Sequence, residues 1–455
     1  MAASAASESP PGFISQRAAR ALQPALSYGK AFVDAQARPW SAEDPGGNII
    51  CSVAENKLTA DMVHERISEA AGRAPVSTLY YPKGFRGTEE ARTAVARMCT
   101  RTFMKGIDVN PGDLVMLAGA GAVLDTLFWS ICGPGEGVLL PKPIYPAFLN
   151  DLEVRDSCVP VLFDLKEPGV KLWSRGHEEE EAAAVPPIPD QLDAAAAAAA
   201  ARGVTVRVLL LAQPNNPTGT VYKRETIEAA IRWCMKHRIH LVSDEIYALS
   251  VWGEGAPEFV STEVVARALA LDLPRDQAEA VPQLVHTVFG FSKDWCASGL
   301  RVGVLHTRNA TLLAVMDNYC YFHTASAHTL WALTQVLSDD AFVDAFVAEN
   351  QRRMRNAYAG LSGALDAAGI PHVRACAAMF AFLDLRAGLK EDSWEGEDEL
   401  WRALCAAGVL LSPGSACKAD KPGYFRCCWA WVPPEALPMA VSRISALLDS
   451  RRKAE

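Results

Sequence analysis

Short apolar runs alternate with helical stretches through the middle of the chain, from about Gly87 to Leu305. The apolar runs are bounded by Gly and Pro and predict buried strands, whereas the stretches between them repeat apolar residues at helical spacing. Strands that alternate with helices indicate a mostly parallel α/β sheet. The predicted strands are 115–117, 137–140, 159–163, 206–212, 240–243, 284–289 and 302–305, and the predicted helices are 88–105, 120–132 and 224–237.

The pattern changes at both ends of the chain. A turn at Gly46–Gly47 precedes a short apolar strand at 49–53 and a helix that begins near Thr59. Beyond about Thr324, long helices are followed by a few strands, which favours a smaller α+β domain. The expected division is a flexible arm over 1–25, the N-terminal part of the small domain over 26–72, a large domain over 73–325 and the C-terminal part of the small domain over 326–455.

Residues 166–201 interrupt the alternation of strands and helices. An acidic run, Glu178–Glu181, precedes a group of prolines, and Ala194–Ala201 follows. We expect the acidic and proline-rich part to be an exposed insertion, and the alanine run to be a helix because alanine is the strongest helix former.

Composition and charge exclude several classes of function. The net charge of -9 is spread along the 455 residues without clustered Lys and Arg, so no nucleic acid is expected as a partner. No run approaches the roughly 20 apolar residues that cross a bilayer, and the N-terminus lacks the order of a secretory signal. A cytoplasmic protein without a membrane partner is expected. The 12 cysteines are scattered without metal-ligand spacing, which predicts reduced buried thiols and no metal.

The sharpest chemical signal is the stretch Gly290-Phe-Ser292-Lys293, which follows a predicted strand and leads to Arg301. A lysine amine can form a Schiff base with an aldehyde cofactor. A neighbouring hydroxyl, here Ser292, can bind a phosphate, and Arg301 can add a charge-assisted pair of hydrogen bonds. Taken alone, the pair Ser292-Lys293 is most simply explained as a surface lysine. The prediction of a cofactor lysine therefore depends on the whole stretch from Gly290 to Arg301.

Two further stretches end predicted strands. Asn216, in Gln213-Pro-Asn-Asn216-Pro-Thr218-Gly, lies where ligand crevices form at the carboxyl ends of parallel strands. Asp244, in Ser243-Asp244-Glu-Ile-Tyr247, would need a cationic partner if buried, and a pyridinium nitrogen is such a partner. Asn216 and Tyr247 can both reach a phenolic oxygen on the ring that carries this pyridinium nitrogen. Separately, the first stretch is an ordinary turn and Asp244 an ordinary helix cap.

The order Asn, Asp-x-x-Tyr, Lys, Arg resembles the class I/II aminotransferase family over most of the chain, from about Ile49 to Leu448. The resemblance implies the fold of type I pyridoxal-phosphate (PLP) transferases, the cofactor pyridoxal 5'-phosphate on Lys293, a small-molecule amino acid substrate, and a homodimer with shared sites. It implies further roles for five residues. Ala120 and Gly121 would hold the phosphate at a helix N-terminus, Tyr145 would lie on the cofactor ring, and Arg426 would bind the substrate carboxylate. A tyrosine of Tyr80-Tyr81-Pro would cross to the partner's site; Tyr81 is the predicted one, and its neighbour Tyr80 is the alternative.

Within this family, the chain is most similar to the 1-aminocyclopropane-1-carboxylate (ACC) synthases. Val53-Ala-Glu55-Asn-Lys-Leu58 resembles their substrate-side motif, which makes Glu55 a substrate-binding residue, and Pro422-Gly-Tyr-Phe-Arg426 resembles their C-terminal signature. The chain departs from the pattern at Thr218, where the synthases usually have Leu, and at Gly290, where many members place a phosphate-binding Ser.

The resemblance implies a reaction that begins with an external aldimine and a carbanion at the substrate Cα, with Lys293 as general base. An ACC synthase would then eliminate methylthioadenosine from S-adenosylmethionine and close a cyclopropane ring. An aminotransferase would instead move the amino group to a 2-oxo acid. Elimination or replacement at the γ carbon of another amino acid is a third prediction, and a non-catalytic homologue is a fourth, which the presence of Lys293, Asp244 and Arg426 disfavours.

Overall fold

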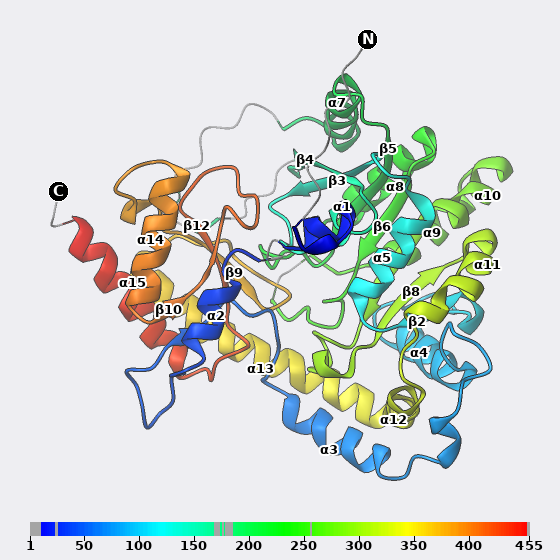
Figure 1. Cartoon of the computed structure of the whole chain (residues 1–455), viewed down its shortest axis with the longest axis horizontal. Coiled ribbons are helices and arrows are strands. Elements are labelled where there is room, and N and C mark those ends of the chain that lie inside the picture. Colours follow the sequence, from blue (N-terminus) through cyan, green and yellow to red (C-terminus); the bar gives the residue numbers. More distant parts are fainter. Residues whose placement is uncertain are drawn as a thin grey trace.

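A computed structural model describes residues 11–22, 26–167, 173–174, 177, 185–254 and 257–452. It shows a large helix-flanked sheet and, beside it, a smaller body built on short sheets (Figure 1). The predicted acidic run, Glu178–Glu181, lies outside the described residues, as do residues 1–10 and 23–25 of the predicted arm.

The large sheet has seven strands in the order β2-β8-β7-β6-β5-β3-β4. Neighbouring strands are parallel from β7 to β4, and β8 runs antiparallel to both β7 and β2. Strands covered on both faces need continuous apolar runs, which is why β5 reads Val-Arg-Val-Leu-Leu-Leu-Ala. The strands are β2 (Leu114–Leu117), β3 (Gly137–Lys142), β4 (Val159–Asp164), β5 (Val206–Ala212), β6 (His240–Asp244), β7 (Val285–Gly290) and β8 (Gly303–Thr307).

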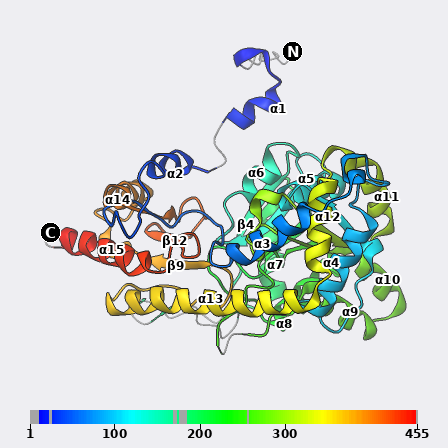
Figure 2. The ribbon, with the colours of Figure 1, turned by 90° about the horizontal axis from the view of Figure 1, so that it is seen from below.

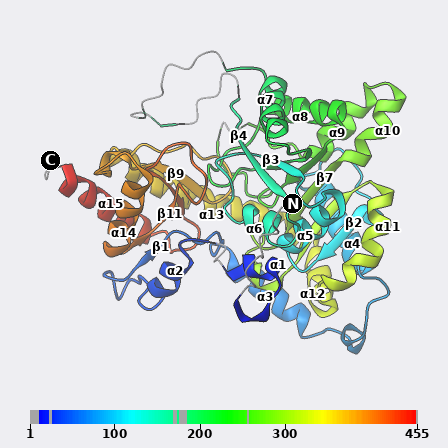
Figure 3. The same cartoon turned by 45° about the horizontal axis from the view of Figure 1, so that its top comes forward.

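Helices cover both faces of this sheet (Figure 3). Side chains of α5, α6 and α11 form one apolar cluster with one face, and those of α7, α8, α9 and α10 form another with the opposite face. A third cluster joins α3, α4 and α12 to the β2 side of the sheet. These helices are α3 (Ala60–Ala71), α4 (Glu89–Arg101), α5 (Ala120–Ile131), α6 (Phe148–Glu153), α7 (Ile188–Ala201), α8 (Arg224–His237), α9 (Thr262–Leu271), α10 (Arg275–Leu284), α11 (Ala310–Tyr319) and α12 (Ala327–Leu337).

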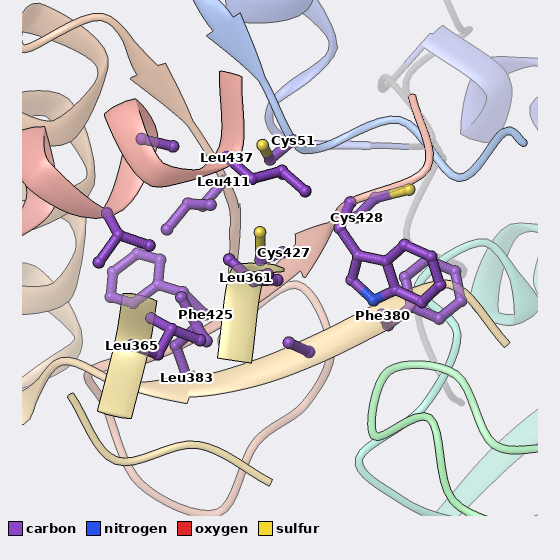
Figure 4. Packing of buried hydrophobic residues seen from close by; sticks show 14 of the residues in the cluster. Cys51, Leu361, Leu365, Phe380, Leu383, Leu411, Phe425, Cys427, Cys428 and Leu437 are labelled. Carbon is purple, nitrogen blue, oxygen red and sulfur yellow. The ribbon is translucent and has the colours of Figure 1, made fainter. Parts of the chain in front are cut away.

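The smaller body contains a three-stranded antiparallel sheet, β11-β12-β9, and a parallel pair, β1 with β10. Its core packs Phe380, Leu383 and Phe425 of the sheet against Leu361 and Leu365 of α13, as the close-up shows (Figure 4). The elements are α2 (Gly29–Ala35), β1 (Ile49–Ile50), α13 (Asp340–Ala367), β9 (Phe380–Asp384), α14 (Trp394–Ala406), β10 (Val409–Leu410), β11 (Ser412–Pro413), β12 (Tyr424–Cys428) and α15 (Ala436–Arg452).

Helix α13 joins the two bodies, because it runs lengthwise beneath both of them (Figure 2). The N-terminal α1 (Gln16–Ala19) stands apart from the rest of the ribbon in the same view. Nearby, Arg20 donates to the Ser157 hydroxyl at 2.8 Å, which ties this segment to the start of β4. Short 3-10 turns complete the chain: η1 (Pro11–Phe13), η2 (Arg20–Leu22), η3 (Val76–Leu79), η4 (Pro111–Asp113), η5 (Ser298–Leu300), η6 (Cys320–Phe322) and η7 (Arg386–Gly388).

The predicted fold class is confirmed: a mostly parallel sheet flanked by helices, with a smaller α+β part. Individual bounds differ from the predicted ones. The strand predicted at 49–53 is limited to Ile49–Ile50, and the helix predicted at 88–105 is Glu89–Arg101, with the Thr88 side chain as its N-cap. The domain boundaries stay predictions. Among the described residues, no helix is both long and apolar enough to span a membrane.

Candidate active site

The predicted chemical residues converge where the parallel strands β5, β6 and β7 end. Asn216 follows β5, Asp244 is the last residue of β6, and Lys293 follows β7. This edge of a parallel sheet is where ligand crevices form. A cavity of about 320 Å³ opens there. All predicted site residues except Tyr81 and Arg426 line it, namely Glu55, Ala120, Gly121, Tyr145, Asn216, Asp244, Tyr247, Ser292, Lys293 and Arg301.

The Lys293 amine lies beside residues 53–59, called here the substrate-side loop. Its Nζ donates to the carbonyl oxygen of Ala54 at 2.6 Å. Burial lowers the pKa of the ammonium, which increases the fraction of free amine that can react. Just before it, Gly290 is held against β8, because a Cβ there would lie 2.8 Å from the Val302 carbonyl oxygen. A serine side chain at position 290 would therefore require this backbone to shift.

Asp244 is a buried carboxyl that lines the same cavity as Lys293. It is 7% exposed and accepts one hydrogen bond, from the Ile246 N–H at 3.2 Å. No ion pair to it occurs in the described part of the chain. Burial raises its pKa to about 7. A buried acid of this kind is expensive until a cation joins it, so its surroundings fit a protonated ring nitrogen.

Tyr145, Tyr247 and Asn216 surround the same cavity. Tyr145 packs edge-on against Phe148, and burial raises the pKa of both tyrosine hydroxyls, so they stay protonated donors. The Asn216 amide oxygen accepts from Arg426 at 3.1 Å. Since its oxygen is engaged, the amide group presents its N–H donors to other partners. The proposed roles of these side chains toward a ring oxygen stay predictions.

The N-terminus of α5 and Arg301 form a second part of the cavity. The first N–H groups of a helix have no acceptor within it, and the helix dipole favours an anion there. Gly119 precedes this helix with φ 99°, and a Cβ on it would lie 2.3 Å from the Arg301 guanidinium. The Arg301 Nη1 donates to the Ser298 carbonyl oxygen at 3.0 Å. Helix N–H groups, the neighbouring Ser292 hydroxyl and a guanidinium fit a phosphate group.

Gly303 of β8 lets this phosphate cradle close. A Cβ at Gly303 would lie 2.3 Å from the carbonyl carbon of Gly119 and 2.4 Å from the Ala120 nitrogen. We expect Gly303→Ala to weaken PLP binding at least ~10-fold and to lower the free energy of unfolding by about 1–3 kcal/mol, since overpacking must displace backbone. PLP titration followed by fluorescence, and chemical denaturation, measure the two effects.

Gly299→Ala is the matched control, because a methyl group there meets nothing within 4 Å. It should bind PLP as the wild type does. Equal affinities in the Gly303 and Gly299 variants would contradict the assignment of the cradle.

Arg426 lies beside the cavity rather than in its lining. It is 1% exposed, and its guanidinium stands 4.9 Å from the Phe380 ring centroid. Sequence reasoning missed what holds it, because the partners come from distant segments. Besides Asn216, the partners of Arg426 are the Tyr28 hydroxyl at 3.2 Å, the Ser52 carbonyl oxygen at 2.9 Å and the Ser412 hydroxyl at 3.0 Å.

Two acidic or hydroxyl groups in the lining were also missed. Asp151 of α6 lines the cavity, and burial raises its pKa to about 7. Ser298, in the turn η5, lines it too and donates to the Glu55 carboxylate. The sequence around Asp151 contains no motif that indicates a site residue. Ser298 lies between Lys293 and Arg301, and only those two residues carried the prediction for that stretch.

Two residues that the sequence analysis singled out, Tyr81 and Thr218, lie outside the cavity. Tyr81 is 85% exposed and its neighbour Tyr80 is 65% exposed, so neither completes the site of its own chain. Thr218 is buried inside its turn, where its hydroxyl donates to the Asn215 side chain at 2.7 Å. Because the Thr218 side chain is used within the turn, this departure from the synthase pattern does not alter the cavity lining.

Comparisons with known proteins agree with this geometry. Residues 51–444 match the family described as aminotransferase class I and II. A 1-aminocyclopropane-1-carboxylate synthase 4 of Oryza sativa subsp. japonica is 34% identical over 91% of this chain and 85% of its own length. A 1-aminocyclopropane-1-carboxylate synthase of Glycine max is 31% identical over 88% of this chain and 80% of its own length. An aspartate aminotransferase double mutant of Thermus thermophilus shares the fold with a TM-score of 0.73, at 23% identity, over 95% of this chain and 99% of its own.

The family match covers most of the chain, and the cavity is lined by groups that fit the family's cofactor, pyridoxal 5'-phosphate. These groups are the Lys293 amine, the buried Asp244 carboxyl and the phosphate cradle of α5 and Arg301. The chain therefore belongs to the PLP-dependent class I and II aminotransferase family.

Proposed function

We propose that the enzyme is an ACC synthase-like lyase that converts S-adenosylmethionine into ACC and methylthioadenosine. The observation that carries the proposal is the position of Glu55. Its carboxylate lines the same cavity as Lys293, where it can face a substrate whose side chain is a cationic sulfonium. Relatives named as ACC synthases, at 31% and 34% identity over most of the chain, support this choice.

The residues divide the work between binding and proton transfer. PLP, when bound, supplies an aldehyde for amines and a ring that accepts electrons. Lys293 holds the cofactor and takes the substrate Cα proton on its Nζ. Asp244 keeps the ring nitrogen protonated. Arg426 binds the α-carboxylate, which fixes the Cα–H bond relative to Lys293.

The elimination itself conserves atoms and charge. The Cα proton passes to Lys293, a bond forms between Cα and Cγ, and the bond between Cγ and sulfur breaks. Sulfur leaves with the bonding electron pair, so a cationic sulfonium becomes a neutral thioether. A negative Glu55 stabilises the cation of the bound substrate, and its hold weakens once the neutral product has formed.

Product analysis tests the proposal. The purified protein with PLP is incubated with S-adenosylmethionine alone, and separately with a panel of amino acids and 2-oxo acids. ACC and methylthioadenosine in the first reaction are the expected result. Amino-group exchange in the second, without ACC in the first, would make the enzyme an aminotransferase. A γ-elimination or γ-replacement product from another amino acid would redirect the proposal to that reaction.

Arg426→Lys tests carboxylate binding. Lysine keeps the positive charge but loses the planar fork that holds a carboxylate at two points. We expect KM for the amino acid substrate to rise by about 10- to 100-fold, with a smaller change in kcat, because the lost contact serves bound substrate and transition state alike. Steady-state kinetics measure both constants. A fall in kcat at unchanged KM would contradict this role.

We further propose that two chains assemble and share their sites. Apolar side chains are exposed together in and after η3, at Val76 (66%), Leu79 (76%) and Tyr81 (85%). Exposed apolar surface of this kind is typical of an interface. Sedimentation is expected to show a dimer, and mixing Tyr81→Phe with Lys293→Ala chains to restore activity through hybrid dimers. A fully active monomer would refute the assembly.

A further inference from the structure

The two residues that follow Glu55 are held by the smaller body. The Lys57 N–H donates to the Ala430 carbonyl oxygen at 2.9 Å, just beyond β12. The Asn56 side chain donates to Asn350 of α13 at 2.8 Å. These contacts fix where the loop lies, but they leave the Glu55 side chain with its own rotatable bonds.

Ser298 holds the Glu55 carboxylate from the other side of the cavity. Its hydroxyl donates to the Glu55 Oε1, and both residues line the cavity. The Ser298 carbonyl oxygen accepts from the Arg301 guanidinium at 3.0 Å. Ser298 therefore connects the phosphate cradle to the one acidic side chain on the substrate-side loop.

Without this bond, Glu55 has a competing partner. Its negative charge already acts on the Lys293 ammonium, whose Nζ lies 2.6 Å from the carbonyl oxygen of the adjacent Ala54. A carboxylate free to rotate would pair with that ammonium. Such a pair would withdraw the charge from the substrate and hold the amine in its protonated form.

We propose that Ser298 is a positioning residue, which keeps the Glu55 carboxylate away from Lys293 and directed at the cationic side chain of the substrate. This inference rests on the proposed function, because it assigns the cation preference of the same site. It predicts that the cavity selects an amino acid with a positive side chain over its neutral analogue, and that this selection depends on the Ser298 hydroxyl.

A contact between the same two segments serves as the control. The Thr59 hydroxyl and the Cys296 thiol lie 3.2 Å apart, so they also join the substrate-side loop to the segment after Lys293. Neither lines the cavity. If Ser298 only tied the two segments together, Cys296→Ala and Ser298→Ala would have similar effects.

The experiment compares S-adenosylmethionine, a sulfonium cation, with S-adenosylhomocysteine, a neutral thioether. Dissociation constants come from the rapid change in cofactor absorbance when ligand is mixed with the PLP-loaded protein, recorded before product accumulates. The wild type is expected to prefer the cation, and Ser298→Ala to reduce that preference about 10-fold. Ser298→Thr, which keeps the hydroxyl, and Cys296→Ala should retain it. In a Glu55→Gln background, Ser298→Ala should have no further effect.

Several outcomes would overturn the inference. These are equal affinities of the wild type for both ligands, an unchanged preference in Ser298→Ala, an equal loss in Cys296→Ala, or additive losses in the double variant. The proposed function is decided separately, by whether ACC forms. A protein that makes ACC but keeps its cation preference without Ser298 would refute the positioning role alone.

Discussion

Replacing Lys293 with alanine is expected to reduce turnover by about 10²- to 10⁴-fold or more. The variant loses the general base, which alone contributes a factor of this size, and it loses the covalent hold on the cofactor. The measurement is the initial rate of product formation at saturating S-adenosylmethionine and PLP. A variant with more than a tenth of wild-type activity would contradict the role of Lys293 as the general base.

Three controls separate these losses. Lys293→Arg keeps a positive charge but forms no Schiff base and is too basic to accept a proton, so it should be as inactive as the alanine variant. Borohydride treatment of the wild type should fix the cofactor to the peptide that contains Lys293, as mass spectrometry will show. A small added amine should partly restore proton transfer in Lys293→Ala, because the cavity would then have room for it.

Asp244→Asn is expected to lower kcat by about 10²- to 10³-fold, the usual effect of removing one buried electrostatic stabiliser at a reacting centre. Asparagine keeps the acceptor for the Ile246 N–H but carries no charge to hold the ring nitrogen protonated. Affinity for PLP should also fall. Steady-state rates and PLP titration measure these changes, and an Asp244→Asn enzyme with near wild-type kcat would contradict the assignment.

The same variant should be more stable than the wild type when PLP is absent. Burial raises the Asp244 pKa to about 7, so the folded state keeps a proton that the unfolded chain releases near pH 4. The contribution of Asp244 to stability is therefore complete at low pH and falls as the pH rises through about 7. At pH 8 we expect Asp244→Asn to gain about 1–4 kcal/mol in unfolding free energy, and the gain to vanish near pH 4.

Glu245 offers a matched control for both readouts. It is the adjacent residue, it is fully buried, and burial raises its pKa to about 7 as well. Its carboxylate accepts from the Thr262 N–H rather than lining the cavity. Glu245→Gln should therefore gain stability at pH 8 in the same way and keep its catalytic rate.

Much of the fold could be predicted because local pattern decides it. Strands β5 and β6 are buried on both faces, so their apolar runs are conspicuous in the sequence. Helix α10 was not predicted, and it contains Pro282, a residue that disfavours the interior of a helix. The structure places this proline near the C-terminal end of the helix.

The site, too, has a part that could be predicted from the sequence and a part that could not. Asn216, Asp244 and Lys293 each follow a strand, so parallel pairing alone brings them to one edge of the sheet. The contacts that tune them could not be predicted, because they join segments far apart in the chain. Tyr28 meets Arg426 from the N-terminal part, and Ser298 meets Glu55 across the cavity. No periodicity encodes such pairs.

The network around Arg426 has a consequence for inhibitor chemistry. Its guanidinium plane is fixed by hydrogen bonds from both terminal nitrogens to Asn216, Tyr28, Ser52 and Ser412. The Phe380 ring faces the same plane, so the guanidinium has no freedom to rotate. A flat carboxylate can use such a fixed surface without an entropic penalty on the protein side. Medicinal chemistry against this enzyme should therefore keep the carboxylate and vary the side chain.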